Sequence, residues 1–138
     1  AAMVFGHTPT QIQASAWLGS TGVDEQAAMI LTHANGAQAL LRTGIRVSTE
    51  QMVRIEGTQG VIVVPNFWHA TEAFLYAGDA SPVHFTAESG YHFEAAEVMH
   101  CVRAGKLESD ALPLDETLAI MRTMDEIRTQ IQLTYPME

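Results

Sequence analysis

Glu97 and His100 stand three positions apart in a segment whose apolar residues recur at helical spacing, so a helix would place both on one face. Such a Glu-x-x-His step is part of a di-metal carboxylate site, which needs a second step and two further glutamates on facing helices. The second helix expected in the chain, over residues 115–133, contains no histidine. We therefore expect no metal centre and assign no metal ligand.

Cys101 is the single cysteine of the chain and directly follows His100. Successive helical residues point about 100° apart, so these two side chains cannot form a nucleophile–base pair. The chain also lacks G-x-S-x-G, G-x-G-x-x-G and P-loop motifs. We interpret Cys101 as a small core residue and assign neither catalytic nor cofactor-binding residues. One cysteine excludes an internal disulfide and favours a cytoplasmic location.

A second cluster lies where the last expected strand gives way to the first long helix. Phe85, Tyr91, His92 and Glu94 combine aromatic rings, an imidazole and a carboxylate near a sheet edge. Groups of this kind hold small polar substrates, and we predict that these four residues form one wall of a substrate pocket. The alternative is a helix-start cluster that packs on the sheet, with its carboxylate stabilised by the helix dipole.

The elements that would position these residues follow from hydrophobic periodicity. Two-residue alternation and β-branched runs predict strands, separated by turns that include Asn35-Gly36 and Gly57 to Gly60. Helical spacing predicts two later helices, one ended by Gly105 and one with Asp115 as its N-cap that ends at Pro136. The strands are expected at residues 9–18, 23–33, 37–47, 51–56, 61–64, 70–76 and 82–86.

The order of many strands followed by two helices, without β-α-β alternation, predicts an α+β fold. We expect one open, mostly antiparallel sheet with helices packed on one face, formed by residues 1–138 as a single domain. A sheet covered on one side leaves its other face open. On the first strands that face would carry Gln11, Gln13, Ser15 and Trp17, together with Thr32. These residues are polar but uncharged, which favours self-association, although an ordinary solvated face is the alternative.

The charge balance limits the partners of this chain. Seven Lys and Arg stand against 16 Asp and Glu, for a net charge of −9, and residues 1–41 and 55–102 contain no Lys or Arg. Without a basic stripe, neither nucleic acid nor an anionic membrane surface is an expected partner. Residues 1–5 read as the end of a helix and lack the basic start of a signal peptide.

Several short motifs follow one another in a fixed order along the chain. Residues 55–60 form an I-x-G-T-x-G turn, and the later motifs are Phe-Glu at 93–94, Gly-Lys-Leu-Glu-Ser at 105–109, Met-Asp-Glu-Ile-Arg at 124–128 and Tyr-Pro-Met-Glu at 135–138. Together these motifs resemble the Gfo/Idh/MocA oxidoreductases, and the later ones are closest to the dihydrodiol dehydrogenase branch of that family.

The resemblance implies a two-domain parent, with a Rossmann domain that binds NAD or NADP and a carboxy-terminal domain that carries substrate contacts and the dimer surface. The chain would be that second domain, and its partners would be the missing Rossmann domain, a second copy and a small-molecule substrate. The family's E-K-P lysine and its second catalytic motif would precede this chain, so no catalytic residue is carried over. The isolated chain would bind no cofactor and be inactive, whereas the parent would transfer hydride between the nicotinamide and a carbinol carbon of a sugar, polyol or cyclic diol.

A second hypothesis comes from a different functional class. The chain would then be a stand-alone, non-catalytic interaction module whose open sheet face binds a protein partner. A dinucleotide fingerprint encoded upstream would favour the first hypothesis, and its absence the second.

Overall fold

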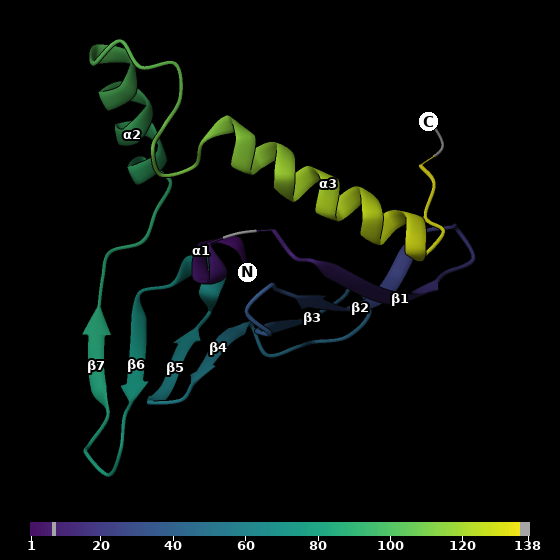
Figure 1. The fold of residues 1–138 in the computed structure, drawn as a ribbon, viewed down its shortest axis with the longest axis horizontal. Helices are drawn as coiled ribbons and strands as arrows, with labels where there is room; N and C mark the ends of the chain where they lie inside the picture. The colour runs from purple at the N-terminus through teal and green to yellow at the C-terminus, as the bar shows by residue number, and fades with distance from the viewer. Residues whose placement is uncertain (7, 136–138) are drawn as a thin grey trace. The chain divides into compact units, whose positions relative to one another are not determined.

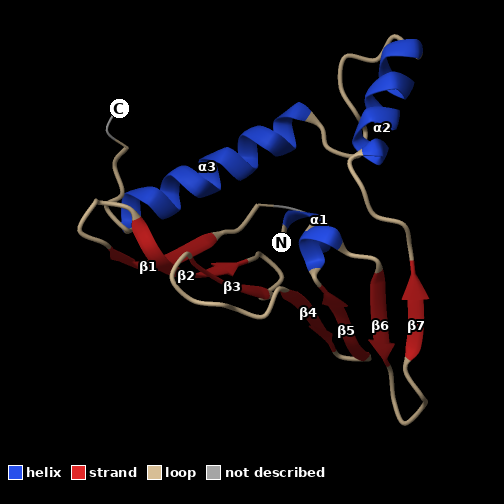
Figure 2. Ribbon diagram, turned by 180° about the vertical axis from the view of Figure 1, so that it is seen from behind, coloured by secondary structure: helices blue, strands red, loops and turns tan. Residues whose placement is uncertain are grey.

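The structure is a computed structural model that describes residues 1–6 and 8–135 (Figure 1). The chain divides into two compact units, one formed by Ala1–Thr49 with Asp110–Glu138 and the other by Glu50–Ser109. Each unit has its own antiparallel sheet (Figure 2). The elements in order are α1 (Ala2–Phe5), β1 (Gln11–Leu18), β2 (Asp24–Thr32), β3 (Gln38–Gly44), β4 (Met52–Gly57), β5 (Gly60–Pro65), η1 (Phe67–His69), β6 (Glu72–Tyr76), β7 (Val83–Thr86), α2 (His92–Arg103) and α3 (Leu114–Gln130).

The sheet of the first unit has the order β1-β2-β3. Exposed and partly buried residues alternate along the whole of β1, because successive side chains of a strand point to opposite faces. The exposed set is Gln11, Gln13, Ser15 and Trp17, and Thr32 lies directly opposite Gln11 in the register. The prediction of which residues share the outward face is therefore confirmed.

The other face of this sheet is covered by α3, which runs along it in both views (Figures 1 and 2). The Gln130 amide joins helix to edge strand: its nitrogen donates to the Ile12 carbonyl at 3.0 Å, and its oxygen accepts from the Ala14 N–H at 2.9 Å. These bonds satisfy backbone groups of β1 that no neighbouring strand pairs. Ala27 and Leu31 of β2 are buried on this side.

The β2–β3 hairpin turns at the predicted Asn35-Gly36 pair. Gly36 adopts a φ of 81°, whereas Asn35 keeps a negative φ. The Gly36 N–H donates to the His33 carbonyl at 2.9 Å, and the Asn35 side chain accepts from the Ala37 N–H at 3.0 Å. This three-residue loop needs glycine at its left-handed position and stabilises itself through the Asn side chain.

The sheet of the second unit has the order β4-β5-β6-β7, with every neighbouring pair antiparallel. The predicted turn from Gly57 to Gly60 joins β4 to β5 and pairs its two glycines across the hairpin. A Cβ at Gly60 would lie 2.3 Å from the Tyr76 carbonyl oxygen, so this position needs glycine for close approach of two backbones. Glycine at position 60 is therefore required by the close packing of two backbones as well as by the turn.

Helix α2 is tied to the segment that follows it. The Ser109 hydroxyl donates to the Glu97 carboxylate at 2.5 Å, and the buried Cys101 thiol lies 3.4 Å from the same oxygen. The helix ends as predicted near Gly105, where the Lys106 N–H returns to the Cys101 carbonyl at 2.9 Å. Cys101 is therefore a core residue of this unit, as expected.

The α+β class and the antiparallel pairing are confirmed, but the strands form two sheets rather than the one open sheet that the sequence analysis expected. The prediction of Asp115 as the N-cap of α3 is wrong: the N-cap is Pro113, whose carbonyl accepts from the Glu116 N–H at 3.1 Å. Proline suits a helix start because it lacks the N–H that the first turn leaves unpaired. The expected stop at Pro136 lies outside the described residues, and the formation of a single domain by the two units stays a prediction. No helix in the described part of the chain is long and apolar enough to cross a membrane.

Candidate functional site

An exposed aromatic cluster, consisting of Trp68, His69 and Tyr91, is the first candidate site. The short helix η1 carries its first two members between β5 and β6. Asn66 adopts a left-handed φ of 46° and turns the chain out of β5, a conformation that Asn tolerates better than most residues. The Phe67 N–H donates to the Gln51 carbonyl at 3.1 Å and fixes this turn against the residue that immediately precedes β4.

The rings of His69 and Tyr91 are in contact although the two residues are 22 positions apart in the chain. The centroids of Trp68 and His69 are 4.4 Å apart, and those of His69 and Tyr91 are 6.1 Å apart with the rings edge to face at 79°. Tyr91 is the N-cap of α2, so the imidazole joins a strand connection to a helix start. Both ends of the cluster face solvent, with 62% of Trp68 and 74% of Tyr91 exposed.

The residue types of this cluster can bind a ligand in two ways. Exposed indole and phenol rings provide flat apolar surface for the ring of a ligand, while the imidazole and the phenol hydroxyl donate or accept hydrogen bonds. These are the groups that hold a ligand with one apolar face and several hydroxyls, such as a sugar or a cyclic diol.

The structure brings only one of the four predicted pocket residues into this cluster, namely Tyr91. Phe85 lies on β7 opposite Ala73 and is half exposed, and within the described part of the chain no ring contact joins it to the cluster. The centroids of the His92 and Phe93 rings are 4.1 Å apart with their planes tilted by 37°, and Glu94 is an exposed residue in the first turn of α2. A pocket wall formed by Phe85, His92 and Glu94 stays a prediction.

Trp68 and His69 were missed by the sequence argument. Two signals were available: Pro65-Asn66 ends a buried β-branched strand, and the next three residues are Phe, Trp and His. Large aromatic residues in a short connection have no strand partner to pack on, which is a reason to suspect function.

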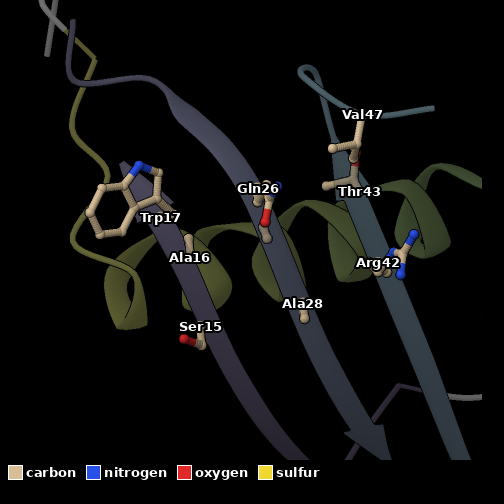
Figure 3. A pocket seen from close by; sticks show the side chains of 9 residues that line it. Ser15, Ala16, Trp17, Gln26, Ala28, Arg42, Thr43 and Val47 are labelled. Atoms are coloured by element: carbon tan, nitrogen blue, oxygen red, sulfur yellow. The ribbon is translucent and has the colours of Figure 1, made fainter. Parts of the chain in front are cut away.

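The open face of the first sheet is the second candidate site, and it is mildly hollowed over about 530 Å³ (Figure 3). Figure 3 shows Trp17, Gln26 and Arg42 on three neighbouring strands, with α3 behind the sheet. Trp17 is 70% exposed and Leu40 on β3 is 76% exposed. A flat face with an indole, an arginine and several amides has the composition of a protein interface.

Two carboxylates of the chain have defined partners. The Ser109 hydroxyl, followed by the Cys101 thiol, holds the pKa of Glu97 below its usual range, because both donate to the charged form. Glu72 contacts His84 at 3.0 Å across the β6–β7 pair, and the His84 ring stacks on Phe74 at 4.6 Å.

Within residues 1–6 and 8–135, no group of three or more His, Cys, Asp or Glu is arranged to hold a metal ion.

The chain matches curated dehydrogenases in sequence. It is 31% identical over 144 residues to a trans-1,2-dihydrobenzene-1,2-diol dehydrogenase of Xenopus tropicalis, with 97% of this chain and 44% of that protein covered. It is 32% identical to the Danio rerio protein of the same name, with 96% and 43% covered. The chain therefore spans less than half the length of these relatives and corresponds to their carboxy-terminal part. No protein-family model matches the chain.

Solved structures share the fold. A UDP-N-acetylglucosamine 3-dehydrogenase from Acidithiobacillus ferrooxidans aligns with a TM-score of 0.75 and 16% identity, over 95% of this chain and 42% of that one. A biliverdin reductase from Synechocystis sp., solved with biliverdin and NADP+, aligns with a TM-score of 0.72 and 15% identity, over 95% and 42%. The resemblance expected from the short motifs, to oxidoreductases and to their dihydrodiol dehydrogenase branch, is confirmed.

Proposed function

We propose that this chain is the substrate-side and self-association part of an NAD(P)-dependent dehydrogenase that oxidises a secondary alcohol of a cyclic diol, polyol or sugar. The observation that carries the proposal is a sequence match over 97% of this chain to 44% of a trans-1,2-dihydrobenzene-1,2-diol dehydrogenase. The fold likeness to a sugar-nucleotide dehydrogenase supports the same class.

In this proposal the aromatic cluster of Trp68, His69 and Tyr91 contacts the substrate. Rings of the cluster would stack on the apolar face of the substrate ring, and the imidazole would hold one of its hydroxyls. The described residues would position the substrate, and the nicotinamide that accepts the hydride would be held elsewhere in the intact protein. NAD or NADP would serve only as the hydride acceptor.

The open face of the first sheet would hold a second copy. Its exposed indole and its scarcity of charge distinguish it from a solvated face, which more commonly carries Lys and Glu. A two-fold contact places the same residues on both sides, so uncharged amides such as those of Gln11 and Gln13 can pair without repulsion. We also propose a cytoplasmic location, in keeping with a single, buried cysteine.

The test compares the 138-residue chain with the intact protein encoded by its gene. The intact protein should quench or enhance NAD(P)H fluorescence on titration and reduce NAD(P)+ with trans-dihydrodiols or polyols. The 138-residue chain alone should do neither. Nucleotide binding by the 138-residue chain would overturn the division of roles, and an intact protein without nucleotide affinity would instead favour the non-catalytic interaction module.

A further inference from the structure

The charged residues around the aromatic cluster of Trp68, His69 and Tyr91 are nearly all of one sign. Residues 55–102 contain six carboxylates and no Lys or Arg, and all three members of the cluster belong to this stretch. The cluster also lies wholly within the second unit. A ligand that contacts these rings therefore meets carboxylates in this stretch and no permanently charged cation.

Three of the six carboxylates are engaged with partners of their own. Glu56 forms an ion pair with Arg54 at 2.6 Å. Glu72 contacts His84 at 3.0 Å, and Glu97 accepts a hydrogen bond from a hydroxyl group. The negative charge that these three present to a ligand is reduced by their partners.

Two other carboxylates, those of Glu88 and Glu94, flank Tyr91 at three positions before it and three after it. Both are exposed, and within residues 1–6 and 8–135 neither has an ion-pair partner. Tyr91 is the N-cap of α2 with helical backbone angles, and Glu94 lies in the first turn. Helical residues three apart share a face, with Cβ atoms about 5–6 Å apart. The Glu94 carboxylate is therefore a neighbour of the Tyr91 ring.

The start of α2 has the opposite electrostatic effect. The N-terminus of a helix carries about half an elementary positive charge, which favours anions. Glu94 brings a full negative charge to the same turn, and Glu88 brings a second. The sum is negative, so the carboxylates determine the sign of the potential beside Tyr91.

The rings of the cluster favour the same sign of ligand charge. The face of an aromatic ring is negative and attracts an ammonium group, whereas it repels an anion. Trp68 and Tyr91 are mostly exposed, so their rings are accessible to a ligand. Ring faces and carboxylates thus both disfavour an anionic ligand.

We propose that the aromatic cluster selects its ligand by charge, with Glu94 as the residue that determines this specificity. It accepts a cyclic diol that is uncharged or carries a protonated amine, and it disfavours one that carries a carboxylate or a phosphate. This inference depends on the proposed function, because it concerns the substrate that the cluster is there proposed to contact. Glu88 and Glu94 should each weaken the binding of an anion about threefold, as expected for exposed charges about 6 Å apart.

The test uses three ligands that differ in charge but share one ring. They are vicinal trans-cyclohexanediol, its ring-amino derivative and its ring-carboxylate derivative, assayed with the intact protein at neutral pH. The kcat/KM of the carboxylate derivative should be about tenfold lower than that of the uncharged diol, and that of the amino derivative should be no lower. The difference should shrink as salt is raised. Equal or faster turnover of the carboxylate derivative would overturn the proposal.

A matched pair of variants locates the effect. Glu94→Gln should reduce the preference for the uncharged diol over its carboxylate derivative about threefold. Glu56→Gln removes the same charge from the same unit, but Glu56 lies at the end of β4 beside the turn to β5, whereas η1 follows the other end of β5. Glu56→Gln should leave the preference unaltered. An equal change in both variants would show a net-charge effect and would contradict the role of Glu94.

Equilibrium binding separates this inference from the function on which it depends. Binding of the three compounds to the intact protein is followed by ligand-observed NMR, which needs no turnover. Binding in the expected order without reduction of NAD(P)+ would contradict only the dehydrogenase assignment. Turnover without discrimination against the carboxylate derivative would contradict only the charge selection, and failure to bind any of the three would overturn this inference as well.

Discussion

The two tryptophans of the chain, one in each unit, have similar exposure but different surroundings. Trp17 is 70% exposed on β1, opposite Gln26 of β2 and on the same face as Ser15 of its own strand, and the surface is flat. Trp68 is 62% exposed on a short helix turned by the left-handed Asn66, with the His69 ring 4.4 Å away. Exposure alone therefore does not define the role of an aromatic residue. Under the proposed function, the backbone that carries each tryptophan would decide whether it meets a flat protein surface or a small ligand.

The largest expected effect concerns association through the flat face. In the intact protein, Trp17→Ala should weaken self-association about 30-fold, because an indole at the centre of an interface commonly contributes about 2 kcal/mol. Sedimentation velocity over a dilution series measures this change. Trp68→Ala, the matched control, should leave the association constant unaltered. An unchanged constant for Trp17→Ala would mean that this face is simply solvated.

The second effect concerns the substrate. Trp68→Ala should lower kcat/KM for a cyclic diol about tenfold, roughly 1.4 kcal/mol, through loss of ring stacking. A larger loss for a cyclic substrate than for an open-chain polyol would identify stacking as the cause. Trp17→Ala assayed at a concentration that keeps the protein associated is the control. Equal loss in both variants would contradict the division between the two tryptophans.

A smaller effect comes from charge placed on the flat face. Gln13→Lys puts like charges across a two-fold contact and should weaken self-association about threefold, as expected for exposed charges. The effect should shrink as salt is raised, because screening acts on exposed pairs. Gln13→Asn provides an uncharged comparison. A charge effect that does not respond to salt would argue against a two-fold contact at this position.

The last prediction concerns the Glu97 carboxylate in the second unit. Ser109→Ala should raise the Glu97 pKa toward its ordinary value, and Cys101→Ala should raise it less, because the Ser109 hydrogen bond is the larger cause of the lowered pKa. A lowered pKa in the folded state adds stability above the ordinary carboxyl pKa, and that stability is lost as the pH falls through the folded value. NMR titration of the carboxyl carbon measures both changes. A greater shift in Cys101→Ala would contradict the order.

The sequence determined much of the fold because strand alternation is a local property. Successive side chains of a strand point to opposite faces wherever that strand lies, so the outward set from Gln11 to Trp17 could be assigned before any contact was known. The turns at Gly36 and Gly57 to Gly60, the burial of Cys101 and the oxidoreductase resemblance follow equally from short segments.

The tertiary structure decided the rest, because meetings between distant segments depend on loop geometry and packing that no short segment encodes. The αL turn at Asn66 and the start of α2 together place His69 beside Tyr91, so Tyr91 alone could be named in advance. The Gln130 amide reaches β1 across 116 residues, and a groove beneath α3 is lined by residues of α1, of the sheet and of α3 itself. The period of the apolar residues and the chemistry of the turns thus fix each strand or helix and its exposed face. The candidate sites, by contrast, form where elements that are far apart in the sequence are brought together.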